Sequence, residues 1–325
     1  MGLTNFPNGV SSFGIPVIGG GGLPATKGNV YFVDYGSGND GNRGKSPDRA
    51  FKTLAYAYTK VTSNNFDIIC LIGSDTHVLT EMLTVAKNRV AIIGLDNSPG
   101  RNYGQAAKVS LGVTTAATDI GTIKDNGVRN VYQNIKFMNS NTVAEGIYCF
   151  VDAGEYTQLL NCEIYKSTDL NVTGAAELVC NGDSSTYINC YIGSTANAIT
   201  GAIIRPTVLM TKAIVSGKVA RDVSFIDCTF ARKCGNVANR FVYGANASDV
   251  ERMCLFKNCI FWNAALAAAT PAQNVAFGAS QTQGSVLLKG CTAIGAATAM
   301  STTTGVFVDG PIPAADTTGI ALQAT

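Results

Sequence analysis

Two acidic residues and one basic residue hold the same place in a repeated segment of the chain. Glu155, Asp183 and Arg221 each stand seven residues before the cysteine of an Asn-Cys or Asp-Cys pair. If the repeats stack as neighbouring strands, the two carboxyl groups lie roughly 5 Å apart, which is the separation that retaining glycosidases use. The pattern could therefore perform acid, base or nucleophilic chemistry on a glycan, with Glu155, Asp183 and Arg221 as the candidate catalytic residues.

The same column also has an interpretation without chemistry. Glu155 and Asp183 each follow a glycine, which indicates a turn, and the next two repeats place Arg221 and Arg252 in the column. Acids and bases on neighbouring strands form ion pairs at a surface. We favour this charge ladder and predict a protein that is not an enzyme, while a polysaccharide lyase or glycosidase remains the alternative.

Metal ligation has a weaker basis in the sequence. Asp34, Asp40 and Asn42 lie in a glycine-rich turn and could hold calcium, but side chains of this type more often accept hydrogen bonds from their own turn. Zinc is disfavoured because His77 is the single histidine and no Cys-x-x-Cys pair occurs. We therefore expect neither a metal nor a cofactor.

A short phrase recurs six times and must position these side chains. It spans residues 133–137, 160–164, 188–192, 226–230, 257–261 and 289–293. Apolar columns stand three residues before and two residues after its central Ile or Cys, so the chain turns a corner between them if both face one core. The corner falls at an Asn, Asp or Gly, residues that tolerate the left-handed conformation. The phrase predicts strand, corner, strand.

The length of the repeat indicates the fold class. Successive phrases begin 27 to 38 residues apart, about one coil of a right-handed parallel β-helix. The apolar runs 68–72 and 90–94 fit the first coils. We predict an all-β solenoid of about nine coils, roughly 40 Å long.

The ten cysteines have three explanations. Five of them continue one column of the repeat: Cys162, Cys190, Cys228, Cys259 and Cys291. In a parallel β-helix this column points inward, so we favour small, buried core residues. Disulfides between coils would need an oxidising compartment, and zinc lacks histidine partners.

Composition limits the classes of partner. Apolar residues make up 46% of the chain, charged residues only 14%, and the net charge is +2. Without a basic run, binding to nucleic acid or to an acidic membrane is not expected. The N-terminal residues lack the cationic start and apolar run of a signal peptide, so we expect synthesis in a cytoplasm and no export by that route.

The chain divides into four parts by composition. They are an extended N-terminal arm (1–28), a strand, turn and short capping helix (29–62), the parallel β-helix (63–310) and a C-terminal tail (311–325). We expect the helix to start at Ser46-Pro47 and to share one apolar face over residues 51–58. The arm is either a disordered leader or a docking segment, and its candidate partner-binding residues are Phe6, Phe13, Ile15, Val17 and Ile18.

A family resemblance supports the solenoid. The stretch V-D-Y-G-S-G-N-D-G-N-R-G-K-S-P-D-R-A-F-K-T-L-A-Y-A resembles the opening module of right-handed parallel β-helix proteins of the pectate-lyase-like superfamily, and the Asn-Cys phrases resemble its coils. The resemblance covers roughly residues 29–300. It implies the fold, but proteins of this fold include polysaccharide lyases, glycoside hydrolases, phage tailspikes and structural virion proteins.

The functional expectation combines these observations. Residues 4–14 are similar to the openings of phage structural proteins, and the arm precedes a capped solenoid. We predict a phage virion protein of the capsid decoration, cement or head-spike type, anchored by its arm to capsid or other virion proteins and forming a homotrimer. The alternatives are a tailspike-like glycan depolymerase and a non-catalytic adhesin for a host-surface glycan, with Trp262 as an outward sugar platform.

Overall fold

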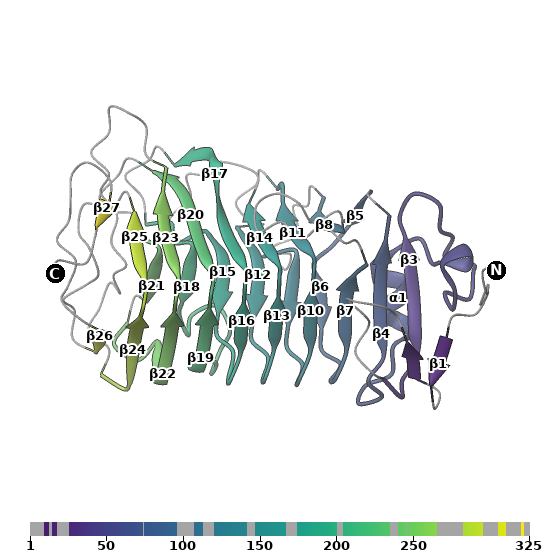
Figure 1. Ribbon diagram of the computed structural model, residues 1–325, viewed down its shortest axis with the longest axis horizontal. Coiled ribbons are helices and arrows are strands. Elements are labelled where there is room, and N and C mark those ends of the chain that lie inside the picture. The colour runs from purple at the N-terminus through teal and green to yellow at the C-terminus, as the bar shows by residue number, and fades with distance from the viewer. Residues whose placement is uncertain are drawn as a thin grey trace, which may run out of the picture.

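The chain forms a three-sheet parallel β-helix, as the repeat predicts (Figure 1). The computed structural model describes residues 10–12, 15–17, 26–73, 75–95, 107–112, 120–141, 147–166, 174–199, 204–234, 240–244, 246–264, 282–294, 305–309 and 320–321. Successive strands of one sheet come from successive coils, so the solenoid grows along one axis without a second core. The predicted fold class is confirmed.

Three sheets form the walls of the solenoid. Sheet 1 contains, in spatial order, β3 (Val30–Asp34), β4 (Ile68–Ile72), β7 (Ala91–Gly94), β10 (Val131–Gln133), β13 (Gln158–Leu160), β16 (Thr186–Ile188), β19 (Ala220–Ile226), β22 (Val250–Lys257), β24 (Gly284–Lys289) and β26 (Val306–Val308). Sheet 2 contains β5 (Thr76–Leu79), β8 (Lys108–Leu111), β11 (Lys136–Asn139), β14 (Glu163–Lys166), β17 (Tyr191–Ile199), β20 (Thr229–Cys234), β23 (Ile260–Asn263), β25 (Thr292–Ile294) and β27 (Ile320–Ala321). Sheet 3 contains β6 (Leu83–Val85), β9 (Ile123–Asp125), β12 (Tyr148–Asp152), β15 (Ala176–Cys180), β18 (Val208–Met210) and β21 (Val242–Gly244).

The strands within the sheets are parallel apart from the last one of sheet 2, β27, which pairs antiparallel with β25. The ten strands of sheet 1 span about 43 Å at about 4.8 Å each. This is one strand more than the nine coils expected, because β3 pairs with β4 ahead of the first coil that the apolar runs predict. A separate antiparallel hairpin joins β1 (Val10–Ser12) and β2 (Ile15–Val17).

The corner between sheets 1 and 2 has the predicted conformation. The Asn and Asp residues of the repeat have φ between 52° and 55°, and Gly290 has φ 61°. Side-chain amides link the coils, since Asn189 Nδ2 donates to Asn161 Oδ1 at 2.7 Å and Asn161 Nδ2 to Asn134 Oδ1 at 3.2 Å. Asparagine therefore serves both the left-handed backbone and a hydrogen-bonded row along the rod.

The apolar columns on both sides of the corner fill the core. Tyr187, Phe225 and Phe256 stack from coil to coil, with ring centroids 4.4 Å and 4.7 Å apart. Phe230 and Phe261 stack at 4.8 Å on the facing sheet. All five rings are fully buried, so the inward direction predicted for these columns is confirmed.

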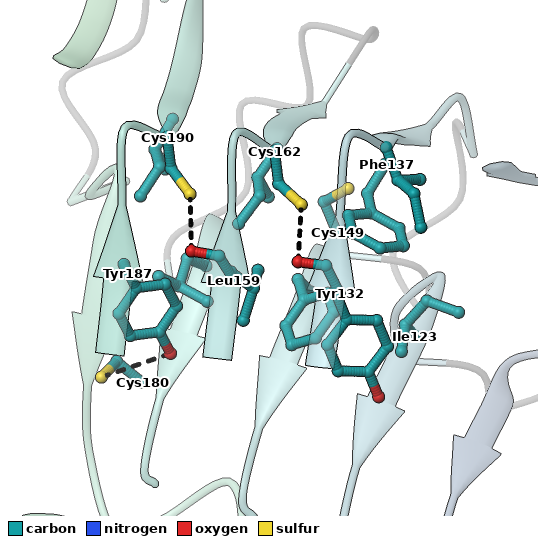
Figure 2. Close-up of a cluster of buried hydrophobic side chains, with 14 of the residues drawn as sticks. Ile123, Tyr132, Phe137, Cys149, Leu159, Cys162, Cys180, Tyr187 and Cys190 are labelled. Carbon is teal, nitrogen blue, oxygen red and sulfur yellow. Dashed lines mark hydrogen bonds between the residues drawn. The ribbon is translucent and has the colours of Figure 1, made fainter. Parts of the chain in front are cut away.

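The cysteine column lies inside the core, as predicted. All ten thiols are free, and only Cys291 is not fully buried. Each sulfur of the column donates to a carbonyl of the preceding coil: Cys162 bonds to Tyr132 O at 3.4 Å and Cys190 to Leu159 O at 3.4 Å (Figure 2). The thiols are thus small core residues with a weak polar contact between coils.

The capping helix differs from the prediction. Pro47–Arg49 forms a separate 3₁₀ turn, and the helix α1 runs only from Leu54 to Lys60. Its N-cap is Thr53, whose hydroxyl accepts a hydrogen bond from the Tyr56 amide at 3.2 Å. Phe51 instead bridges to β3, and Ala55 is exposed. The predicted start was wrong because Phe51 pairs with a strand, and the helix begins at Leu54, seven residues after Pro47.

The short helix still closes the end of the core. Leu54 and Ala57 are buried in the main apolar cluster together with Phe51. Among the described residues, no helix is long and apolar enough to span a membrane.

Candidate functional site

A second corner, before sheet 1, carries the predicted carboxyl pair. Its left-handed residues are Arg89, Arg129, Tyr156, Ser184, Asp222 and Arg252, with φ between 48° and 62°. The positions just before this row form parallel bridges from Val128 to Glu155, from Glu155 to Asp183 and from Asp183 to Arg221. The structure thus brings Glu155, Asp183 and Arg221 together on adjacent coils, at about 4.8 Å per step.

The register changes after Arg221. Glu251, rather than Arg252, lies opposite Arg221, because β22 has an extra residue where β19 has none. Such a bulge shifts all later pairings by one residue. The prediction that Arg252 continues the column was therefore wrong. We call Glu155, Asp183, Arg221 and Glu251 the charged ladder.

Each carboxylate of the charged ladder has a basic partner. Lys218 Nζ lies 3.2 Å from Glu155 Oε1, and Arg221 Nη1 lies 3.0 Å from Asp183 Oδ2. Arg221 also pairs with Glu251, and hydrogen bonds to Glu251 and then Asp183 raise the pKa of the guanidinium. The side chains of Glu155 and Asp183 remain 45% and 26% exposed. Solvent reaches this pair, which lacks the dry surroundings typical of a general acid.

A second acidic pair lies inside the rod and was not anticipated from the sequence. Asp125 and Asp152 end β9 and β12, pair in register, and are fully buried. Burial, followed by the charge of Asp152, raises the pKa of Asp125 to about 7. The pKa of Asp152 is raised as well, mainly by burial. Asp125 is therefore about half protonated near pH 7.

Hydrogen bonds hold both buried acids in place. Asp125 accepts from the Gly127 amide at 2.9 Å, from Asn130 Nδ2 at 2.9 Å and from the Thr157 hydroxyl at 3.0 Å. Asp152 accepts from the Tyr187 hydroxyl at 2.5 Å. The repeated phrase Asp-x-Gly at residues 125–127 and 152–154 is the sequence signal for this pair. Because both acids are shielded from solvent, we assign them a structural role in the core.

The glycine-rich turn uses its polar side chains locally. Asp34 Oδ1 accepts hydrogen bonds from the amides of Gly36 and Ser37, both at 3.0 Å. Asp40 accepts from the Lys52 and Thr53 amides, both at 2.9 Å. Asn42 donates to a backbone carbonyl at 2.9 Å. Asp34 matches the turn interpretation, whereas Asp40 and Asn42 bond to residues 50–53, which follow the turn. The described residues contain no group of three acidic, His or Cys side chains placed to hold a metal ion.

His77 faces the core from the first strand of sheet 2. It pairs with Val109 and is 1% exposed, and burial lowers the pKa of its imidazole to about 4. The ring lies edge-on to Tyr35, with centroids 6.1 Å apart. A neutral imidazole in an apolar column is a core residue, not an exposed acid or base.

Of the remaining candidate residues, the structure describes Trp262, Ile15 and Val17. Trp262 in β23 is 36% exposed and points away from the core, as predicted. Ile15 and Val17 lie in β2. Phe6, Phe13 and Ile18 are outside the described residues, so docking by the arm stays a prediction.

Comparisons with known proteins agree on the fold. No family model and no curated protein matches the chain. Pectate lyase Pel9A aligns with TM-score 0.57 and 13% identity, over 81% of this chain and 62% of the lyase, so the chain spans less than two thirds of that enzyme. The Aspergillus niger pectin methylesterase in its deglycosylated form aligns with TM-score 0.51 and 14% identity, over 88% and 81%. At these identities the likeness shows a parallel β-helix and nothing about activity.

Proposed function

We propose that the protein is a structural component of a phage virion, of the capsid decoration, cement or head-spike type. Its β-helix would act as a rigid body that associates with copies of itself, as a homotrimer, and is anchored to the capsid by the N-terminal arm. The observation that carries this proposal is an apolar outer surface on sheet 1.

The outer surface of sheet 1 is apolar over consecutive coils. Leu160, Ile188 and Ile226 lie in register, and each points away from the core because its neighbour along the strand points inward. Further along the rod Lys257 and Lys289 continue this column, and a second outer column, in register with Ser224, is made by Leu255, Leu287 and Phe307. These side chains are partly exposed, and Phe307 reaches 56%.

In the first coils the matching surface of sheet 1 is shielded from solvent. The matching outward residues Cys70 and Ile93 are only 0% and 3% exposed and belong to a separate apolar cluster with Ile68. The later coils leave equivalent apolar side chains open. Extended apolar surfaces mark interaction sites, and a second rod offers the same strand period of about 4.8 Å. This supports self-association.

The charged ladder supports a role without catalysis. Its acids are paired with Lys218 and Arg221 and remain in contact with solvent. Such surface pairs contribute about 0 to 1 kcal/mol each to stability and need no further explanation.

Deletion of residues 1–25 tests the anchoring step. This truncation keeps Thr26, whose hydroxyl bonds to the Phe66 carbonyl, and thereby leaves the body of the solenoid intact. We expect the full chain to co-sediment with purified capsid shells and the truncated chain to stay in the supernatant. Circular dichroism and the melting temperature of both proteins serve as the control for folding. Equal binding of both forms to shells would show that the arm is not the anchor.

A glycan-active protein is the second candidate. It is favoured by the adjacency of Glu155 and Asp183, by the exposed Trp262, and by structural neighbours that are a pectate lyase and a pectin methylesterase. Host polysaccharides incubated with wild type and with Glu155→Gln would separate the candidates. Release of reducing ends or unsaturated products by wild type alone would favour the enzyme. Saturable binding on a glycan array that Trp262→Ala abolishes would favour the adhesin.

A further inference from the structure

A small pocket lies on the outer surface near the N-terminal end of the rod. Its volume is about 110 Å³, and its apolar floor is formed by Ile68, Ala91 and Val131, which lie in register on sheet 1. Arg89 and Arg129 line the same pocket from the corner before that sheet. The pocket therefore combines an apolar floor with two cationic groups.

The two arginines occupy equivalent places on adjacent coils. The Arg89 amide donates to Val128 O at 2.9 Å, and the Arg129 amide donates to Glu155 O at 2.7 Å. Their Cα atoms are thus about one strand spacing apart, or roughly 4.8 Å. Both have left-handed backbones, with φ 56° and 60°. Glycine or asparagine would adopt this conformation with less strain, so the sequence retains arginine here at an energetic cost.

Aromatic rings fix both guanidinium groups. Arg89 Cζ lies 5.1 Å from the centre of the Phe66 ring, and Arg129 Cζ lies 5.4 Å from the centre of the Tyr156 ring. Lys27 Nζ also lies 5.4 Å from the centre of the Phe66 ring. Stacking orients a guanidinium and leaves its N–H groups at the edge, where they can bind a ligand.

Neither guanidinium has an anionic partner among the described residues. No hydrogen bond or ion pair joins the side chain of Arg89 or Arg129 to a carboxylate of that part of the chain, whereas Glu155 pairs with Lys218. The third arginine of that row, Arg252, by contrast forms an ion pair with Asp222 at 2.8 Å. The donors of the two pocket arginines are available to a ligand.

We propose that Arg89 and Arg129 form a binding site for an organic oxyanion, a carboxylate carried on a small apolar group. The guanidinium forks match the two oxygens of a carboxylate, and the apolar floor takes the attached carbon group. The volume suits such a group and not a drug-sized molecule, for which pockets of about 300 to 1,000 Å³ are usual. This site goes beyond the proposed virion role and does not depend on it.

A titration with 4-fluorobenzoate, followed by ¹⁹F NMR at constant ionic strength, tests the site. We expect saturable binding to the full-length protein and at least about tenfold weaker binding of 4-fluorobenzyl alcohol, which keeps the ring and lacks the charge. Acetate should compete weakly, because it keeps the charge and lacks the ring. Equal binding of acid and alcohol would overturn the proposal.

Matched variants locate the binding. Arg89→Gln and Arg129→Gln should each weaken 4-fluorobenzoate binding about tenfold, and Arg129→Lys should recover only part of the loss because lysine lacks the fork. Lys52→Gln removes one exposed positive charge elsewhere and should leave the affinity unchanged. Unchanged binding in both arginine variants, or an equal loss in Lys52→Gln, would overturn the site. Melting curves of all variants confirm that they are folded.

Discussion

Asp125 and Asp152 are single residues whose burial destabilises the fold that contains them. Two stacked carboxyl groups inside an apolar solenoid can be tolerated only if protons or hydrogen bonds offset the loss of water. The structure supplies donors from Gly127, Thr157 and Tyr187. Gly127 is required there, because a Cβ would lie 2.3 Å from the side chain of Asn130.

The pKa of Asp125 gives a pH-dependent stability. Its folded value of about 7 lies above the usual 3.8, so the unfolded chain loses its proton first as the pH rises. Folding stability should therefore fall between about pH 4 and pH 7 and level off above that. Asp125→Asn should remove most of this slope and be more stable than wild type at about pH 8, because asparagine keeps the bond from Gly127.

Urea unfolding midpoints at about pH 5 and about pH 8 measure this effect. His77 acts in the opposite sense below about pH 6.5, since its lowered pKa makes the unfolded chain bind the proton first. Comparing Asp125→Asn with wild type at each pH cancels that contribution. Parallel pH profiles of the two proteins would contradict the assignment.

At the scale of the structural element, the corners decide where strands begin and end. The Asn corner was predictable from sequence because its residue types are those that adopt positive φ. At the second corner the glycines before Glu155 and Asp183 indicated a turn but not its left-handed positions, because arginine, tyrosine and serine occupy positive φ there and none of them favours it. The bulge at Arg252 and the late start of α1 at Leu54 were missed for a similar reason: both depend on pairing with another strand, which local sequence does not encode.

Substitutions at Asn189 test the role of the Asn corner. Its φ of 52° and its bond to Asn161 both contribute. Asn189→Gly keeps the backbone conformation and loses the bond, whereas Asn189→Ala loses both. We expect alanine to lower the free energy of unfolding by about 1 kcal/mol more than glycine does. Chemical denaturation of the three proteins measures this difference. Equal losses would mean that the left-handed backbone carries no cost at this corner.

At the scale of the whole molecule, the outer surface of sheet 1 is the surface through which we expect copies of the rod to associate. Ile226→Asp places a charge at the end of the open apolar column of Leu160, Ile188 and Ile226, so we expect it to reduce the mass of the protein in solution from that of a trimer to that of a monomer. Val78→Asp is the matched control, because Val78 is 39% exposed on sheet 2. Light scattering measures both masses. A wild type that is already monomeric, or an Ile226→Asp protein that stays assembled, would contradict self-association.

The buried thiols give the rod a property that its shape alone does not reveal. Burial raises the pKa of Cys149 to about 12, and it also raises the pKa of Cys190 and Cys228 in the repeat column. Thiolate, the form that reacts, is therefore scarce while the coils stay closed. The column places one sulfur in each of five successive coils, and at the four that are fully buried, Cys162, Cys190, Cys228 and Cys259, alkylation requires that the coil opens. Identifying which cysteines are alkylated first would therefore show which end of the rod opens first.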